Sequence, residues 1–303
     1  MTMNRKSWPP NLVGAGWIFV SALTFTVMMT LVKFLGTGYP AAVQSAYRQM
    51  ASLAFMVPIV ARQRSAILST SRPVLLLCTM ALSTVSLVLS LYSYQMLHFA
   101  EANALSFTRT LWLVPLANLI LKEPIGWVRG GAIALGFAGT MVMLNPGGGG
   151  VGKGLNELAA LAAALTAAGV IICMKTLTRD HKLLTVMAWS AVAGFIFSII
   201  PALFVWRWPS LFDLLLLSAM GVMGVCTQAS YIKGLSMGQV AAVAPVDYVR
   251  LPLTALFGWL LFQERPESTA LLGGGIVIVS TLIISWQEFR AYKMAAAILT
   301  STE

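Results

Sequence analysis

Residues Gln239 to Pro266 read QVAAVAPVDYVRLPLTALFGWLLFQERP, a stretch long enough to cross a lipid bilayer. Its middle holds Asp247 and Arg250, three residues apart, together with two prolines, Pro245 and Pro252. Residues three apart share a face of a helix, so the carboxylate and the guanidinium can pair. Charged side chains are costly at bilayer depth and normally face the protein interior or a wet cavity. The stretch therefore predicts a proline-containing transmembrane helix whose charges face inward.

The first half of the chain contains a counterpart of this stretch, AEANALSFTRTLWLVPLANLILKEP, at residues 100–124. In both stretches an arginine is followed fourteen residues later by a glutamate: Arg109 by Glu123, and Arg250 by Glu264. Soon after each glutamate comes a proline, and then a glycine-rich apolar run. This repeated pattern predicts that the chain is built from two related halves.

The composition excludes a soluble protein. Of 303 residues, 58% are hydrophobic and only 10% are charged, with a mean hydropathy of +0.82, whereas soluble domains carry about 25% charged residues. The net charge of +10 does not predict nucleic-acid binding, because the lysines and arginines occupy short connectors between apolar runs. The three cysteines lie inside apolar runs without a CxxC spacing, so neither a disulfide framework nor a zinc site is expected.

Apolar segments of about 20 residues, the length of a membrane-spanning helix, recur ten times and predict an all-α polytopic membrane protein. The first segment follows Arg5 and Lys6 and is too long for the apolar part of a cleaved signal peptide. The expected spans are 11–34, 40–61, 73–95, 99–121, 126–145, 155–176, 183–205, 210–232, 240–262 and 268–287.

The positive charges predict the orientation of the chain. Thirteen of the 20 lysines and arginines fall in connectors on the side of the N-terminus, four fall on the opposite side, and three lie within spans. Cytoplasmic connectors carry the excess of positive charge, so both termini are expected in the cytoplasm, with the protein in the inner membrane.

The predicted organisation is two five-helix repeats, at residues 1–146 and 155–287, joined by a glycine-rich linker at 147–154 and followed by a cytoplasmic tail at 288–303. Five helices per repeat is an odd number, so the repeats must have opposite orientations, as in many secondary transporters. The linker reads GGGGVGKG but lacks the Ser or Thr that a phosphate-binding loop needs after its lysine. Nucleotide binding is therefore not expected.

These features resemble the drug/metabolite transporter superfamily, in particular its ten-helix EamA-type members. The resemblance rests on the two five-helix repeats, on KEP at 122–124 and QERP at 263–266, and on the glycine-rich helix after each. It implies alternating access around a central cavity lined by the first, third and fourth helices of each repeat. The segments FTRTLW and DYVRLP also resemble the branch that transports S-adenosylmethionine.

Arg109 and Arg250 are the first candidates for substrate binding. Two guanidiniums can hold an anionic group, because arginine binds carboxylate or phosphate with two parallel hydrogen bonds and stays charged. Alternatively, they satisfy carbonyls that Pro115 and Pro252 release, or pair with acids. Asp247 is expected to neutralise Arg250 or to bind a substrate ammonium, with proton coupling as the less favoured role. In the Arg-to-Glu register it corresponds to Ser106, so only one half carries the acid.

Other candidates are weaker. Glu101, at the start of the fourth span, is a second candidate proton site, although an acid at a helix start is commonly only a solvated residue. Arg48, in the second span, has no basic counterpart in the second half and is a further candidate substrate contact. Polar and aromatic residues expected near the cavity are Tyr94, Asn103, Trp112, Gln228, Tyr231 and Tyr248.

The leading hypothesis is a secondary transporter, acting as a monomer in the lipid bilayer, of a small polar metabolite that is amino-acid-like or otherwise anionic. The alternatives are S-adenosylmethionine uptake and proton-coupled export of hydrophobic drugs. The absence of an acid in the first span, at 11–34, argues against drug export. A membrane-embedded enzyme is not expected, because the two histidines lie in connectors and no catalytic motif is present. No cofactor or metal is expected.

Overall fold

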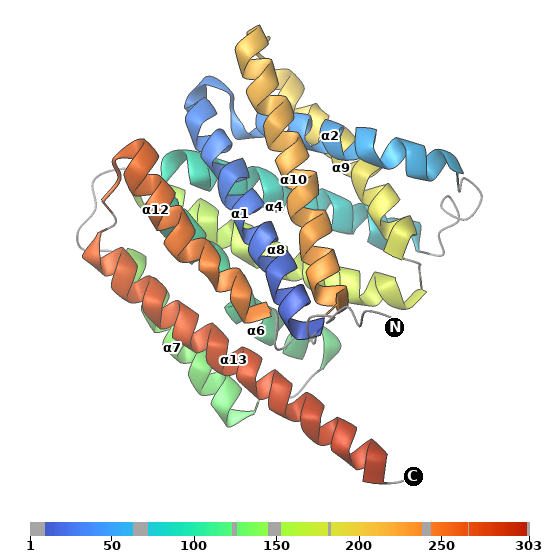
Figure 1. Cartoon of the computed structure of the whole chain (residues 1–303), viewed down its shortest axis with the longest axis vertical. Coiled ribbons are helices and arrows are strands. Elements are labelled where there is room, and N and C mark those ends of the chain that lie inside the picture. The colour runs from blue at the N-terminus through green and yellow to red at the C-terminus, as the bar shows by residue number, and fades with distance from the viewer. Residues whose placement is uncertain are drawn as a thin grey trace, which may run out of the picture.

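The computed structural model describes residues 10–62, 72–122, 126–144, 153–180, 183–237, 244–265 and 267–301 (Figure 1). These ranges form helices and short connections, and no β-strand occurs in them, so the all-α prediction is confirmed there. Glu123 and residues 147–152 of the expected linker lie outside the described ranges.

The first half follows the expected spans, with one helix broken in two. The predicted span 99–121 is divided at Thr108 into a short helix and a longer one. The elements are α1 (Pro10–Leu35), η1 (Gly36–Gly38), α2 (Ala41–Arg62), α4 (Pro73–Met96), α5 (Phe99–Phe107), α6 (Arg109–Leu121) and α7 (Trp127–Leu144).

The second half has the same order, with two differences from the expectation. The predicted span 240–262 begins as a 3₁₀ helix, and the last helix continues through the expected tail to Ser301, beyond the other helices (Figure 1). The elements are α8 (Lys153–Asp180), α9 (Leu183–Phe204), α10 (Leu211–Met237), η2 (Ala244–Val249), α12 (Arg250–Phe262) and α13 (Ser268–Ser301).

The helices have the length and hydropathy of a polytopic membrane protein. Among the described residues, four are long and apolar enough to cross a bilayer: Leu12–Gly38, Pro73–Met96, Gly154–Met174 and Leu211–Met237. Three shorter apolar helices accompany them, at Gly130–Met143, Ala191–Phe204 and Ser268–Ile284. The number of crossings and the side on which the termini lie stay predictions.

The most extensive helix contacts form between the two halves of the chain. α1 packs on α10, and its counterpart pair is α4 on α8, while α2 packs on α9 and α7 on α13. In Figure 1, α7 and α13 run side by side at one edge of the bundle. The largest buried apolar cluster joins α1, α2, α4, α5 and α10, and includes Tyr94 and Phe99. This core surrounds the segment where α5 meets α12.

Glycines allow α7 and α13 to approach closely. A Cβ atom at Gly273 would collide with the carbonyl oxygen of Gly139, and one at Gly139 would lie 2.8 Å from the side chain of Ile276. Small residues at such contacts are typical of helix pairs in membranes, where close packing replaces the hydrophobic drive. The contact therefore depends on the absence of side chains.

Replacing Gly273 with alanine should destabilise the protein by about 1–3 kcal/mol, because the added methyl group forces the two backbones apart. Gly275→Ala is the matched control, since a Cβ there meets nothing within 4 Å. Thermal unfolding in detergent should show a lower midpoint for Gly273→Ala and no loss for Gly275→Ala. Equal midpoints for the two variants would contradict the packing.

Candidate functional site

Two helix breaks place an arginine at equivalent points in the two halves. α5 ends at Phe107 and α6 begins with Arg109, while η2 ends at Val249 and α12 begins with Arg250. At the first break, Thr108 turns its amide and its hydroxyl back to the Leu105 carbonyl, at 3.1 and 2.7 Å. Discontinuous helices at membrane depth are typical of transporter binding sites, because their freed backbone and side chains line the site.

Asp247 lies between the two arginines. Its Oδ1 atom is 2.7 Å from Nε of Arg250, and its Oδ2 atom is 3.6 Å from Nη2 of Arg109. The prediction of an ion pair within 239–266 is therefore correct, and the carboxylate also reaches the other half of the chain. One negative and two positive charges leave this cluster, the Arg109–Asp247–Arg250 triad, with one excess positive charge.

The two arginines have different surroundings. The guanidinium of Arg250 lies over the ring of Phe25, 4.2 Å from its centroid, and donates to the Ser21 hydroxyl at 3.5 Å. Its side chain is 9% exposed, whereas that of Arg109 is 37% exposed and meets Asp247 only at the longer distance. Arg250 is thus held on several sides, while Arg109 retains donors for another partner.

Ser21 connects the triad to α10. Its hydroxyl donates to the carbonyl of Thr227 at 3.0 Å, and Thr227 in turn donates to the Thr24 hydroxyl at 3.0 Å. Sequence analysis missed Ser21 and Phe25, because nothing in the apolar run around them distinguishes them from core residues. The only available signal was the general expectation that the first helix lines the cavity.

Tyr94 and Asn103 lie in a buried hydrogen-bonded chain. The Tyr94 hydroxyl donates to Oδ1 of Asn103 at 3.1 Å, and Nδ2 of Asn103 donates to the Thr254 hydroxyl at 3.2 Å. The chain ties α4, α5 and α12 together beside the triad. With these partners satisfied, both residues serve packing in this structure, and their contact with a substrate stays a prediction.

The aromatic candidates lie on the broken helices. Tyr248 packs its ring on Phe107, with centroids 4.9 Å apart, so aromatic surface borders the triad from both halves. Trp112 packs edge-on to Phe137 at 4.7 Å, and its buried Nε1 atom has no hydrogen-bond partner among the described residues. A buried donor without a partner is costly, which makes Trp112 a suitable contact for a substrate acceptor.

The remaining candidates are more dispersed. Tyr231 of α10 is half-buried and lies within electrostatic reach of Arg250, whereas Gln228 is exposed. Arg48 of α2 lies against α10, where a Cβ at Gly224 would come within 2.8 Å of its Nε atom. Glu101 is buried at the start of α5, and its Oε2 atom lies 3.5 Å from Nδ1 of His98.

The described residues contain no group of three or more His, Cys, Asp or Glu side chains that could hold a metal ion. The charged chemistry of the site rests on guanidinium and carboxylate groups. These groups bind and orient charged ligands, and neither Arg109 nor Arg250 is placed to act as an acid or base, because a guanidinium keeps its proton.

Comparison with known proteins places this geometry in context. The model of the EamA-like transporter family matches residues 12–145 and 155–286. The chain is 27% identical over 281 residues to the S-adenosylmethionine uptake transporter of Rickettsia bellii, covering 92% of this chain and 95% of that protein. It is 26% identical over 299 residues to the riboflavin transporter of Rhizobium johnstonii, covering 94% and 95%. These names indicate transport of small metabolites rather than catalysis.

A solved crystal structure shares the fold. It superposes with a TM-score of 0.60 over 93% of this chain and 98% of the other, at 16% sequence identity. The resemblance to EamA-type transporters is thus confirmed at the level of the family, over both halves of the chain.

Replacing Asp247 with asparagine should destabilise the protein by about 3–5 kcal/mol, because it leaves the buried Arg250 guanidinium without its counter-charge. The double variant Asp247→Asn with Arg250→Met should recover part of this loss, since both buried charges are removed together. Thermal unfolding in detergent compares the two variants with the wild type. An Asp247→Asn midpoint equal to that of the wild type would show that the ion pair contributes nothing to stability.

Proposed function

Because the chain belongs to the EamA-like transporter family, we propose that it is a secondary active transporter of a small metabolite with an anionic, amino-acid-like group. The observation that carries this proposal is the triad, in which Asp247 lies between Arg109 and Arg250 at the two helix breaks. An excess positive charge in an apolar surrounding favours a ligand that brings a negative group.

Arg109 is the residue that receives the anionic group. Its guanidinium is the more exposed of the two and contacts Asp247 at only 3.6 Å. Arg250, held by Asp247, Phe25 and Ser21, keeps the carboxylate of Asp247 in place. The pair of arginines therefore has divided roles, rather than the equivalent roles that the internal repeat alone suggests.

A zwitterion satisfies every member of the triad. Its carboxylate binds the guanidinium of Arg109, and its ammonium binds Oδ2 of Asp247, the oxygen that faces Arg109. One long ion pair is thereby replaced by two, while the pair of Asp247 with Arg250 stays intact. A substrate with both charges forms two ion pairs at the site, whereas a substrate with one charge forms only one. This difference in binding free energy gives the site its selectivity.

S-adenosylmethionine is the second candidate substrate. It carries an amino-acid group, a sulfonium cation and an adenine ring, and several relatives at 27–28% identity bear the name of its uptake transporter. The observation in its favour is the Phe107–Tyr248 aromatic pair beside the triad, because aromatic faces attract both cations and heterocycles. Drug export is less supported, since α1 contains no acidic residue.

The proposal also covers the membrane location, the orientation and the oligomeric state of the protein. The bias of positive charge places both termini in the cytoplasm and the chain in the inner membrane. The charged triad then lies between α5–α6 and η2–α12, near the midplane of the bilayer, where transporters with inverted repeats bind substrate. We infer that a single copy carries the complete site, because both arginines and Asp247 come from one chain.

Arg109→Gln should lower uptake by about tenfold or more, since a charge-assisted pair contributes about 1.5–3 kcal/mol. Uptake of labelled amino acids, S-adenosylmethionine and riboflavin is measured in proteoliposomes, with Arg207→Gln as the control, an exposed arginine in the connection before α10. The uptake of one zwitterionic substrate should fall with Arg109→Gln and not with Arg207→Gln. Uptake of riboflavin alone, unaffected by Arg109→Gln, would overturn the proposal, because riboflavin has no anionic group.

A further inference from the structure

A second charged contact lies at the far end of α12. The side chains of Lys33, in the last turn of α1, and Glu264, just after α12, form a close ion pair. The Nζ atom of Lys33 also donates to the carbonyl of Leu97 at 2.6 Å, and Oε2 of Glu264 accepts the amide of Phe99 at 2.7 Å. The contact, here called the Lys33–Glu264 latch, joins α1, the α4–α5 connection and the α12–α13 connection.

The sequence around Glu264 is shaped for this contact. Gln263 has a φ of 55°, in the left-handed region, and the amide of Glu264 bonds the Gly258 carbonyl at 3.0 Å. This turn folds the glutamate back along α12. A Cβ at Gly258 would lie 3.1 Å from Oε2 of Glu264, so glycine leaves space for the carboxylate. Because its Oε2 atom accepts the Phe99 amide, Glu264 caps the start of α5.

The latch is less deeply buried than the pair of Asp247 with Arg250. The side chains of Lys33 and Glu264 are 12% and 15% exposed, whereas those of Asp247 and Arg250 are 8% and 9% exposed. Each charge has a backbone partner beside its ionic one, at Leu97 and Phe99. The latch is therefore the more accessible of the two ion pairs, and separating its charges costs less than separating Asp247 from Arg250.

A continuous row of aromatic rings connects the latch to the triad. Lys33 lies over Phe262 at 5.6 Å, and Phe262, Phe99, Tyr94 and Phe25 follow one another with centroids 5.7–6.4 Å apart. The row ends where Arg250 lies over Phe25. The rings fill the route between the two charged groups, so this end of the molecule is closed in the structure.

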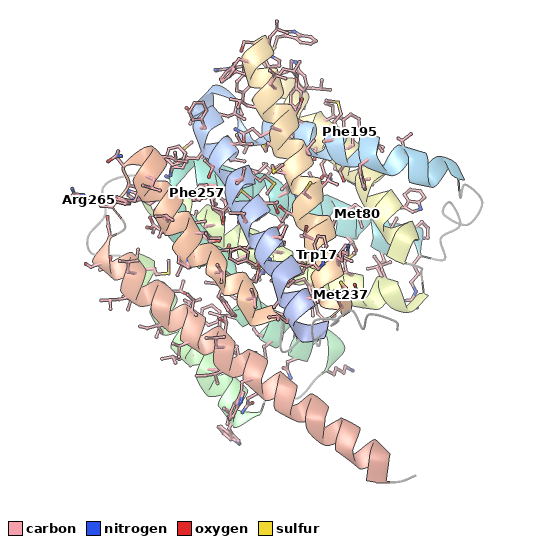
Figure 2. The ribbon with its side chains drawn as sticks, viewed as in Figure 1. Trp17, Met80, Phe195, Met237, Phe257 and Arg265 are labelled. Atoms are coloured by element: carbon pink, nitrogen blue, oxygen red, sulfur yellow. The ribbon has the colours of Figure 1, made fainter. Side chains whose placement is uncertain are left out.

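We propose that the Lys33–Glu264 latch is the gate of the transporter at this end and that α12 links it to the substrate site. The proposal rests on the proposed function. Helix α12 has 13 residues, with Arg250 at its start and the turn to Glu264 at its end, which places the two about 20 Å apart on one rigid element. Figure 2 shows Phe257 on α12 and Arg265 at the latch end, whereas Trp17 and Met237 lie at the other end of α1 and α10.

In this mechanism, substrate that moves Arg109 away from Asp247 changes the position of α12 through the pair of Asp247 with Arg250. Displacement of α12 pulls Glu264 from Lys33 and Phe99, and the aromatic row separates. Alternating access needs such a coupling, because opening one end must depend on the state of the central site. On the charge bias of the connectors, the latch lies at the non-cytoplasmic end, so the structure is closed on that side.

The test measures access to Thr254, which is fully buried and lines a small recess with His98, Ala255, Gly258 and Glu264. Thr254→Cys is introduced after Cys78, Cys173 and Cys226 are replaced by serine, and its labelling by a membrane-impermeant methanethiosulfonate is timed. Glu264→Gln should accelerate labelling about fivefold or more, because losing the ion pair shifts the equilibrium between closed and open states. Glutamine still accepts the Phe99 amide, so the variant removes the charge and keeps the cap.

Glu267→Gln is the control, since it makes the same change at an exposed residue three positions along the chain. Its labelling rate should equal that of the parent. Lys33→Gln provides a second removal of the ion pair if Glu264→Gln does not fold, as judged by its thermal unfolding. Unchanged labelling in folded Glu264→Gln or Lys33→Gln would overturn the gate. The measurement needs no substrate, so it distinguishes failure of the gate from failure of the proposed substrate class.

Discussion

The ion pair of Asp247 with Arg250 is the interaction on which the rest of the structure depends. A guanidinium inside a membrane protein is tolerated only with a counter-charge and with its remaining donors satisfied. Asp247 supplies the charge, the Ser21 hydroxyl accepts one guanidinium N–H, and the ring of Phe25 packs against the guanidinium. Because these partners come from η2 and α1, and Arg250 itself begins α12, their arrangement fixes how the second broken helix sits on the first helix of the chain.

The two halves share a scaffold but differ at the residue that pairs with the arginines. Both halves break a helix at an arginine, and the halves pack as related pairs, with α1 on α10 and α4 on α8. At the position where the second half has Asp247, the first half has Ser106, whose hydroxyl bonds the Asn103 carbonyl at 2.6 Å. Arg109 thus lacks an acid at the equivalent position of its own half and reaches across to Asp247 at 3.6 Å, which leaves its guanidinium with donors for another partner. A polar substrate with distinct ends needs such an asymmetric site.

The helices and the pairing of Asp247 with Arg250 could be predicted from sequence, because the first depend on hydropathy and the second on local spacing. The apolar runs give the helices to within a few residues, as for α1 and α4, and the three-residue spacing of Asp247 and Arg250 gives their pairing. Contacts between distant segments could not be predicted. Lys33 and Glu264 are 231 residues apart in sequence, and no local spacing indicates that they pair. The extension of α13 to Ser301 could not be predicted either, since hydropathy marks the apolar part of a helix and not its end.

The ion pairs at the two ends of α12 differ in burial, which explains how one rigid helix can keep one pair while it breaks the other. At the start of α12, the pair of Asp247 with Arg250 is 8–9% exposed, so separating its charges would place them in a medium that cannot solvate them. At the end of α12, Lys33 and Glu264 are 12% and 15% exposed, so separating them costs less than separating the inner pair. Motion of α12 therefore keeps the inner pair and breaks the outer one. The inner pair carries the movement of the site into the helix, and the outer pair releases the end of the bundle that the aromatic row closes.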